Sequence, residues 1–216
     1  MGRENKKEAV AAFHREQIIE ASESLFSEKG FEQTTVDDIS KQSGYSRRTV
    51  YAYFESKEDI LNHIVEKGLI SLKGDIESAL TLEGGFFEQY KAICDSFIKY
   101  HGNCPRSFEN VSAANTDKFE SDGLPDTLKR ILKLGTQINS LLADFIKNAQ
   151  ERGIIRREVN PLMSVYILWS ELSSLITLAD TKGRFICNQF SVSKEEFLDY
   201  GFRQIINSVL EKKIQL

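Results

Sequence analysis

The chain has 216 residues, a formal net charge of −4, 41% hydrophobic residues and 28% charged residues. These values are typical of a soluble globular protein, and they exclude a disordered chain and a non-specific polycation. No apolar run approaches the roughly 18 residues of a membrane span, and residues 1–10 lack the apolar core of a signal peptide. We therefore expect a cytoplasmic protein that does not enter a membrane.

The N-terminal residues 1–8 are polar, and we expect them to be frayed. A basic arm that reaches a DNA minor groove is the alternative, with Arg3, Lys6 and Lys7 as its cations. Apolar side chains at helical spacing predict a helix from Ala9 to Lys29, and Gly30 is typical of a left-handed helix end.

A helix-turn-helix pattern follows, because apolar residues have helical spacing on both sides of Gly44. Thr35 is a good cap for a short first helix, with Asp38 at the third helical position as its reciprocal partner. Gly44 ends that helix because glycine tolerates a positive φ, and Ser46 caps the second helix.

The first turn of the second helix carries Arg47, Arg48 and Thr49, at the position where a helix-turn-helix contacts base edges. Arginine offers a planar donor fork to guanine or phosphate. A merely solvated helix face remains an alternative, since helix-turn-helix shapes also occur in proteins that do not bind DNA.

The charge of this region depends on the window chosen. Residues 1–60 contain nine Lys and Arg against twelve Asp and Glu, a balance of −3. From Lys41 to Lys57 there are four basic residues and one acid, a balance of +3. DNA responds to the nearby patch because the Debye length is about 8 Å at physiological salt. The acids of the first helix must therefore point away from DNA.

The run T-T-V-D-D-I-S-K-Q-S-G-Y-S-R-R-T-V-Y-A-Y-F-E-S-K-E-D-I, from Thr34 to Ile60, resembles the DNA-binding segment of the tetracycline-repressor (TetR-like) family of bacterial transcriptional regulators. The resemblance covers roughly the first quarter of the chain. It departs from the family pattern at Tyr45, where a small aliphatic residue is usual, and in the unusually basic Arg47–Arg48 pair. The operator sequence therefore cannot be carried over.

The resemblance implies a bacterial homodimer that binds a double-stranded DNA operator and is released by a small-molecule effector. It implies a helix N-terminus on the DNA backbone at Thr35 and phosphate contacts from Tyr51 and Lys57. The candidate DNA-binding residues are Thr35, Ser46, Arg47, Arg48, Thr49, Tyr51, Tyr53 and Lys57.

The rest of the chain is predicted to be helical, so the fold class is all-α. Ser56 caps a helix that runs to about Leu80 and contains Gly68 and Gly74, which make it a possible hinge. We expect a DNA-binding domain in residues 1–55 and a helical ligand-binding and dimerisation domain in residues 56–216. The further helices expected in that domain are 86–100, a weaker 107–115, 125–152, 161–180 and 194–212.

The last two long helices are the expected dimer interface. From Leu162 to Leu178 and from Phe197 to Leu210 their apolar content exceeds what one buried stripe needs. A helix in the centre of its own domain is the alternative. With two-fold symmetry, the two recognition helices would lie about 34 to 36 Å apart on a near-palindromic site.

An aromatic helix face in the C-terminal domain, within residues 86–100, indicates either a core or a cavity for a small apolar molecule. The candidate ligand-binding residues are Phe87, Tyr90, Cys94, Phe97, Phe119, Tyr166, Trp169 and Glu171. Glu171 lies in an apolar helix and could anchor a cationic or hydroxylated ligand. It could also pair with an arginine (Arg152, Arg156 or Arg184) or lie exposed at a helix edge.

Neither a metal nor a cofactor is expected. Cys94, Cys104 and Cys187 are odd in number and indicate free thiols. Cys94, His101 and Cys104 form at most an incomplete zinc set with irregular spacing. Nucleotide loops, paired metal motifs and nucleophile elbows are absent from the sequence, which argues against an enzyme acting on a hydrophobic substrate. A helical module that binds another protein is the second alternative.

Overall fold

The computed structural model describes residues 2–103 and 124–212, and this part of the chain is built of helices, with one isolated bridge between Ile155 and Leu210. The prediction of an all-α fold is confirmed. The predicted weak helix 107–115 lies outside the described residues. The helices are α1 Gly2–Lys29, α2 Val36–Ser43, α3 Arg47–Tyr53, α4 Lys57–Leu80, α5 Phe86–Asn103, α7 Asp126–Glu151, α8 Pro161–Phe190 and α9 Lys194–Asn207.

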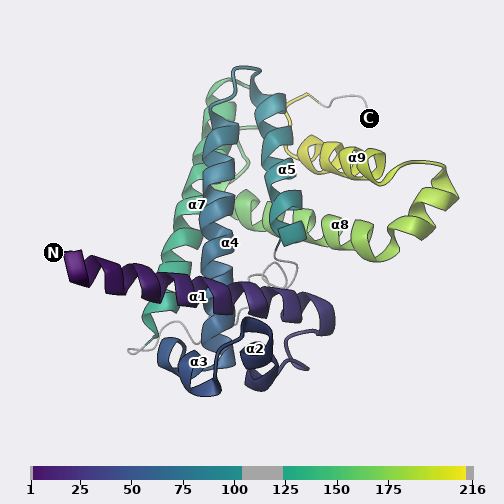
Figure 1. Ribbon diagram of the computed structural model, residues 1–216. Coiled ribbons are helices and arrows are strands. Elements are labelled where there is room, and N and C mark those ends of the chain that lie inside the picture. The colour runs from purple at the N-terminus through teal and green to yellow at the C-terminus, as the bar shows by residue number, and fades with distance from the viewer. Residues whose placement is uncertain (1, 104–123, 213–216) are drawn as a thin grey trace.

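Helix α1 crosses one end of α4, with α2 and α3 beneath it (Figure 1). It ends at Gly30, whose φ is 88°, and the ring of Phe31 folds back to 5.1 Å from that of Phe26, as the sequence predicts. The expectation that residues 1–8 are frayed is wrong, because α1 begins at Gly2. This segment contains good helix formers and no proline, so the helix continues through it.

Helix α4 is the long central element that connects the two halves of the molecule (Figure 1). Ser56 caps it by accepting the N–H of Asp59 at 3.1 Å. One face is buried along most of its length, from Ile60 in its first turn to Ile76 among α5 and α7. The hydrophobic core is therefore continuous from one half to the other.

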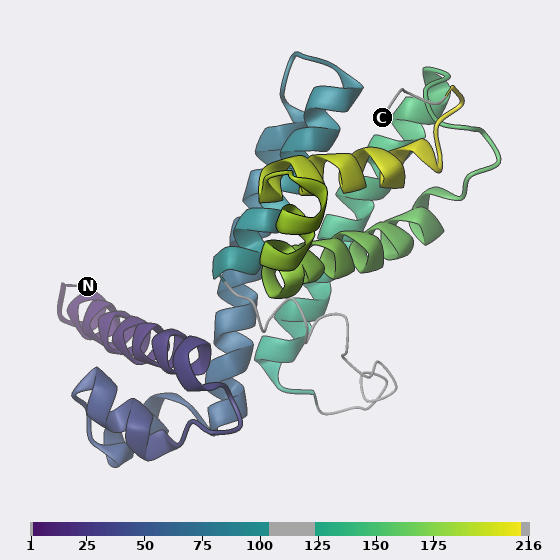
Figure 2. The ribbon, with the colours of Figure 1, turned by 90° about the vertical axis from the view of Figure 1, so that its right-hand side faces the viewer.

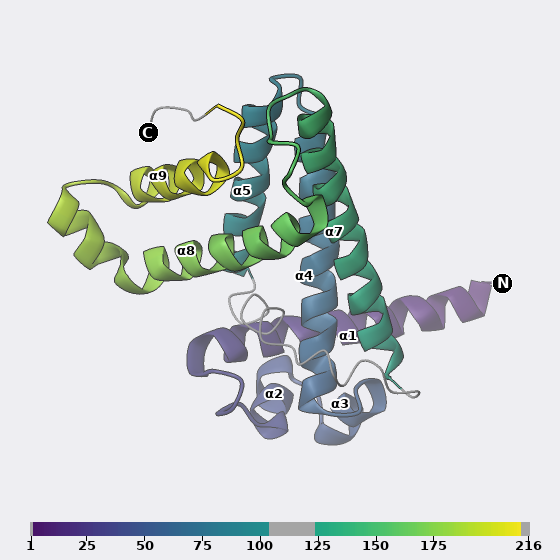
Figure 3. The same ribbon diagram turned by 180° about the vertical axis from the view of Figure 1, so that it is seen from behind.

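Helices α5 and α7 flank α4, and α8 and α9 pack against them on one side (Figures 2 and 3). The prediction that the eighth helix ends near Asp180 is wrong, because nothing breaks it before Ser191, a residue with a φ of 55°. The prediction that the last helix continues to Lys212 is also wrong. It ends at Asn207, where the chain turns to bond with the loop after α7, through Arg156 N–H to Val209 O at 3.1 Å.

Helix α8 is the one helix among the described residues that is long and apolar enough, by length and composition alone, to cross a membrane. A helix of a soluble protein passes the same test when its apolar faces are covered. Much of α8 is not covered by the described residues, since only 28% of its most apolar window is buried. The helix therefore has a face available to a partner.

Candidate nucleic-acid interface

The N-terminus of α2 is fixed by a reciprocal cap. The Thr35 hydroxyl accepts the N–H of Asp38 at 3.2 Å, and the Asp38 carboxylate accepts the N–H of Thr35 at 2.9 Å. The Lys29 ammonium lies 2.8 Å from the same carboxylate. Hydrogen bonds from Lys29 and then Thr35 hold the pKa of Asp38 well below its ordinary value. The predicted capping box is confirmed, and Lys29 strengthens it.

The turn and the second cap also match the prediction. Gly44 ends α2 with a φ of 74°, a left-handed conformation that favours glycine. Ser46 caps α3 by accepting the N–H of Thr49 at 3.1 Å. The two hydroxyls of Ser46 and Thr49 lie 2.9 Å apart, so both are engaged within the first turn of α3.

Helix α3 has one buried side, and the burial of that side fixes which side chains are exposed on the other. Val50 and the following Phe54 are buried in the core, which fixes the orientation of the short helix. Arg47, Arg48 and Tyr51 are then exposed on the opposite surface. The two arginines thus lie at the N-terminal end of a recognition helix, which is where a helix-turn-helix contacts base edges.

Two further predicted contact residues, Lys57 and Tyr53, also have partners within the chain. Lys57 donates to the carbonyl of Phe31 at 2.7 Å, and its ammonium lies 4.1 Å from the centre of the Phe31 ring. Tyr53 is half-buried, and its hydroxyl lies 3.0 Å from Nδ1 of His14. A DNA contact from either side chain stays a prediction.

Sequence reasoning missed two residues that position α3. The His14 ring lies 5.1 Å from that of Tyr45 before the helix and 5.9 Å from that of Tyr53 at its end. Asp37 forms an ion pair with Arg47. His14 and Tyr53 are 39 residues apart, and no local pattern could have paired them.

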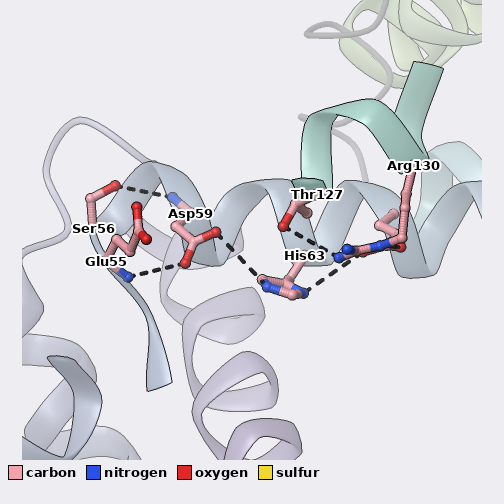
Figure 4. A network of polar contacts seen from close by, with 7 residues as sticks. Glu55, Ser56, Asp59, His63, Thr127 and Arg130 are labelled. Carbon is pink, nitrogen blue, oxygen red and sulfur yellow. Dashed lines mark hydrogen bonds and ion pairs between the residues drawn. The ribbon is translucent and has the colours of Figure 1, made fainter. Parts of the chain in front are cut away.

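A polar network follows α4 away from this domain to α7 (Figure 4). The network begins at Asp59, whose N–H is bonded to the capping Ser56. Oδ1 of Asp59 lies 3.8 Å from Nε2 of His63, and Nδ1 of His63 lies 3.8 Å from Oε2 of Glu66. The two oxygens of Glu66 accept from Arg130 of α7, one of them from Nη2 at 2.9 Å. The hydrogen bond to Glu66 raises the pKa of Arg130. This network connects the first turns of α4 to the first turns of α7.

Residues 18–64, which include all of α2 and α3, match the family model for bacterial regulatory proteins of the tetR family. The helix-turn-helix segment of this chain is therefore similar to that of TetR-family transcriptional regulators. The HTH-type transcriptional regulator YfiR of Bacillus subtilis is 47% identical over 53 residues, which cover 24% of this chain and about a quarter (26%) of YfiR. A similarity to an HTH-type transcriptional regulator of Haemophilus influenzae is longer but weaker, with 22% identity over 199 residues and 91% of each chain.

The fold of this chain is also similar to that of solved regulators. The crystal structure of FadR from Bacillus subtilis in complex with stearoyl-CoA has a TM-score of 0.65 and 16% identity, and covers 89% of this chain and 98% of that chain. At that identity the likeness concerns the fold alone. It comprises an N-terminal helix-turn-helix and a C-terminal helical domain.

The C-terminal domain of this chain contains a cavity of about 100 Å³ lined from α5, α7, α8 and α9 and from the loop after α7. Three of the predicted ligand-binding residues, Tyr90, Phe97 and Glu171, lie on its wall. No local pattern indicates the contributions of the other elements, such as Phe145 of α7 and Ile206 of α9. Among the described residues the wall is mostly apolar, and Glu171 is its one charged side chain.

Glu171 is exposed at the edge of α8, and no ion pair is found for it among the described residues. Partial desolvation raises the pKa of its carboxyl group. Of the structural roles considered for it, exposure at a helix edge is therefore the one observed. Pairing with Arg152, Arg156 or Arg184 is not.

Four other predicted ligand-binding residues lie away from the cavity wall. Cys94 is buried, and burial raises the pKa of its thiol to about 12, so it is an inert core residue. Trp169 donates from its indole nitrogen to Asn139 at 2.9 Å. The other two are Phe87 and Tyr166, whose side chains are exposed. Phe119 lies outside the described residues.

Proposed function

We propose that this chain is a cytoplasmic TetR-like repressor that binds a near-palindromic operator as a homodimer and leaves it when a small apolar effector binds. The observation that carries the proposal is the capped α2–Gly44–α3 unit, which exposes Arg47 and Arg48 at the first turn of α3. The local balance of +3 from Lys41 to Lys57 favours DNA at this surface despite the acidic chain.

A second copy of the chain is the proposed cover for α8 and α9. Large apolar side chains are exposed on both helices, and a monomer rarely leaves so many on adjoining elements. They are Leu162, Met163, Tyr166, Ile167, Leu178, Phe185, Phe190 and Tyr200. Two-fold pairing through these helices would present two recognition helices to one face of DNA.

Size-exclusion chromatography with light scattering, without detergent, tests this interface. Phe185→Glu places a charge on the exposed face of α8, where Phe185 is 68% exposed, and should convert a dimer to a monomer. Ile70→Glu is the matched control, because Ile70 is 56% exposed on α4, away from the proposed interface. A wild-type monomer would contradict the dimer, and a chain soluble only in detergent would favour a membrane partner for α8.

The cavity supports an apolar effector. Its volume of about 100 Å³ is smaller than the roughly 300 to 1,000 Å³ of typical ligand sites, so a ligand must move the surrounding helices apart. FadR of Bacillus subtilis, which shares the fold, was solved with stearoyl-CoA. We therefore place long-chain acyl compounds first among the effectors to test, followed by uncharged and cationic apolar molecules that suit Glu171.

The proposed release is a shift between two arrangements of the helices. An effector that binds better to the widened bundle favours that arrangement by its difference in affinity. Because α7 lines the cavity and also holds α4 through Arg130 and Glu66, movement of α7 would be transmitted to α4 and then to α3. The two recognition helices would lose the spacing that the operator requires.

Footprinting on the DNA that flanks the gene for this chain tests the proposal directly. We expect protection of two half-sites about one helical turn apart, and an affinity that falls steeply with salt, because each neutralised phosphate contributes about 0.9 to the slope. Replacing Arg47 or Arg48 by alanine should cost about 1 to 3 kcal/mol of binding free energy. Binding to DNA with no salt dependence, or none at all, would favour the protein-interaction module.

A further inference from the structure

Arg47 and Arg48 are adjacent and both exposed, yet the structure treats them differently. Nε of Arg47 forms an ion pair with Asp37 of α2, although the Arg47 side chain is still 63% exposed. Among the described residues no ion pair is found for Arg48. The two candidate base-contacting residues are therefore not equivalent, which the sequence alone could not indicate.

The two neighbouring acids of α2 also differ. Asp38 is committed to the cap of α2, through Thr35 and Lys29. Asp37 takes no part in that cap, and its carboxylate is directed across the turn to the first residue of α3. An acid near a DNA-facing helix end would repel phosphate unless a cation neutralises it, and Arg47 is that cation.

The atom that makes the contact matters. A guanidinium has five N–H donors, one on Nε and four on the two terminal nitrogens. An arginine held at Nε keeps its terminal nitrogens available as a parallel pair of donors, which is the geometry that matches O6 and N7 of guanine. A carboxylate at Nε also restricts a side chain that is otherwise flexible, so less freedom is lost when a base is contacted.

We infer that Asp37 is a positioning residue that determines specificity: it holds Arg47 so that its terminal nitrogens contact a guanine in each half-site, while Arg48 contacts phosphate. The inference rests on the proposed DNA binding and goes beyond it by giving the two arginines separate roles. The competing view is that Asp37 only weakens binding by repelling phosphate.

A selection experiment separates these views. The full-length chain is incubated with a library of random-sequence duplexes, bound molecules are sequenced, and affinities are then measured by fluorescence anisotropy on the selected duplex and on an unrelated one. We expect the wild type to enrich a guanine in each half-site. Asp37→Ala and Arg47→Ala should both lower the preference for that same guanine, by about tenfold. Asp37→Asn, which keeps an acceptor without the charge, should lie between wild type and Asp37→Ala.

Arg48→Ala should retain the guanine preference but weaken binding to both duplexes by similar factors, and should reduce the salt slope by about 1. Glu32→Gln is the matched control, because it removes a negative charge from an exposed residue of the same domain without touching Arg47. It should leave the preference unchanged. Circular dichroism melting of every variant checks that the fold is retained.

Retention of the guanine preference in Asp37→Ala overturns the inference. So does equally tighter binding of that variant to both duplexes, which would mean that the carboxylate only repels phosphate. If the wild type enriches no sequence at all, the proposed function fails and the inference fails with it, so the two failures are distinguishable.

Discussion

The two ends of this molecule differ in how far apart along the sequence their contacting residues lie. Around the recognition helix, caps and turns join residues three to five positions apart, as in Thr35 with Asp38 and Ser46 with Thr49. In the C-terminal domain, the cavity brings together residues as distant as Tyr90 and Ile206. The caps of α2 and α3 therefore depend on neighbouring residues, although His14 of α1 also contacts α3 through Tyr53. A cavity assembled from four helices, by contrast, changes when any of them moves.

The largest effect is expected where long-range packing is removed. Phe202 of α9 is 2% exposed, and Phe202→Ala should lower the free energy of unfolding by about 3 to 5 kcal/mol, because it leaves a cavity in the core. Urea unfolding measures this by two signals: the fluorescence of Trp169, the single tryptophan of the chain, and far-ultraviolet circular dichroism.

Phe87→Ala is the matched control, since Phe87 belongs to the same domain but is 46% exposed. It should cost about 1 kcal/mol or less. We expect the two signals to shift together in Phe202→Ala, because α4 contributes to the core of both halves. If only the Trp169 signal shifts, the two halves unfold independently and the comparison becomes one between separate domains.

The same contrast explains which features the sequence could predict. The caps at Thr35, Ser46 and Ser56, and the helix ends at Gly30 and Gly44, depend on neighbouring residues and were predicted correctly. Pairings across the fold left no sequence signal, because Glu66 and Arg130 are 64 residues apart. The end of α9 was missed for the same reason, because α9 stops where distant loop residues supply other partners for the backbone.

The aromatic pattern of α5 was informative only in part. It correctly indicated Tyr90 and Phe97 on the cavity wall, but the same pattern included Cys94, which is fully enclosed in the core, and Phe87, which is exposed. Helical spacing identifies one face of a helix. It does not identify which part of that face meets another helix and which part borders a cavity.

A pair of equivalent caps offers a smaller and sharper test. Thr35→Ala removes the capping box of α2 and Ser193→Ala removes that of α9. Each should lower the free energy of unfolding by about 1 kcal/mol. Only Thr35→Ala should also weaken DNA binding, measured by anisotropy, because α2 supports the recognition helix. Equal loss of DNA affinity in both variants would show that the C-terminal cap controls the DNA-binding domain as strongly as its own.

A smaller effect on stability is expected when the ion pair between α7 and α4 is removed. Arg130→Ala removes the cation that joins α7 to Glu66 of α4. The stability loss should be about 1 kcal/mol or less, because the Arg130 side chain is half exposed. Hydrogen exchange in the first turns of α4 should nevertheless become faster than in Lys129→Ala, a control that removes an exposed pair with Asp126 on the same helix. Identical exchange in both variants would remove the network from the proposed release mechanism.

The smallest effect is expected for the pH dependence of folding stability. The pKa of Asp38 is lowered in the folded chain, first by the Lys29 hydrogen bond and then by those of Thr35, so the unfolded chain binds the proton more readily. The resulting stability is therefore present above the ordinary carboxyl pKa, and is lost as the pH falls below it towards the lower folded value. The pKa of Glu196 in the cap of α9 is lowered as well, because of its hydrogen bonds with Ser193.

In melting curves between pH 7 and pH 3, the difference in Tm between wild type and Asp38→Asn should shrink on acidification, and the same should hold for Glu196→Gln. Since both carboxylates lie at the surface, added salt should reduce the contribution of Lys29 to Asp38 but leave the cap of Glu196, which depends on a backbone N–H, nearly unchanged. A difference in Tm between wild type and Asp38→Asn that stays constant with pH would mean that the hydrogen bonds of the cap with Thr35 stabilise the start of α2, and that the charge of Lys29 does not.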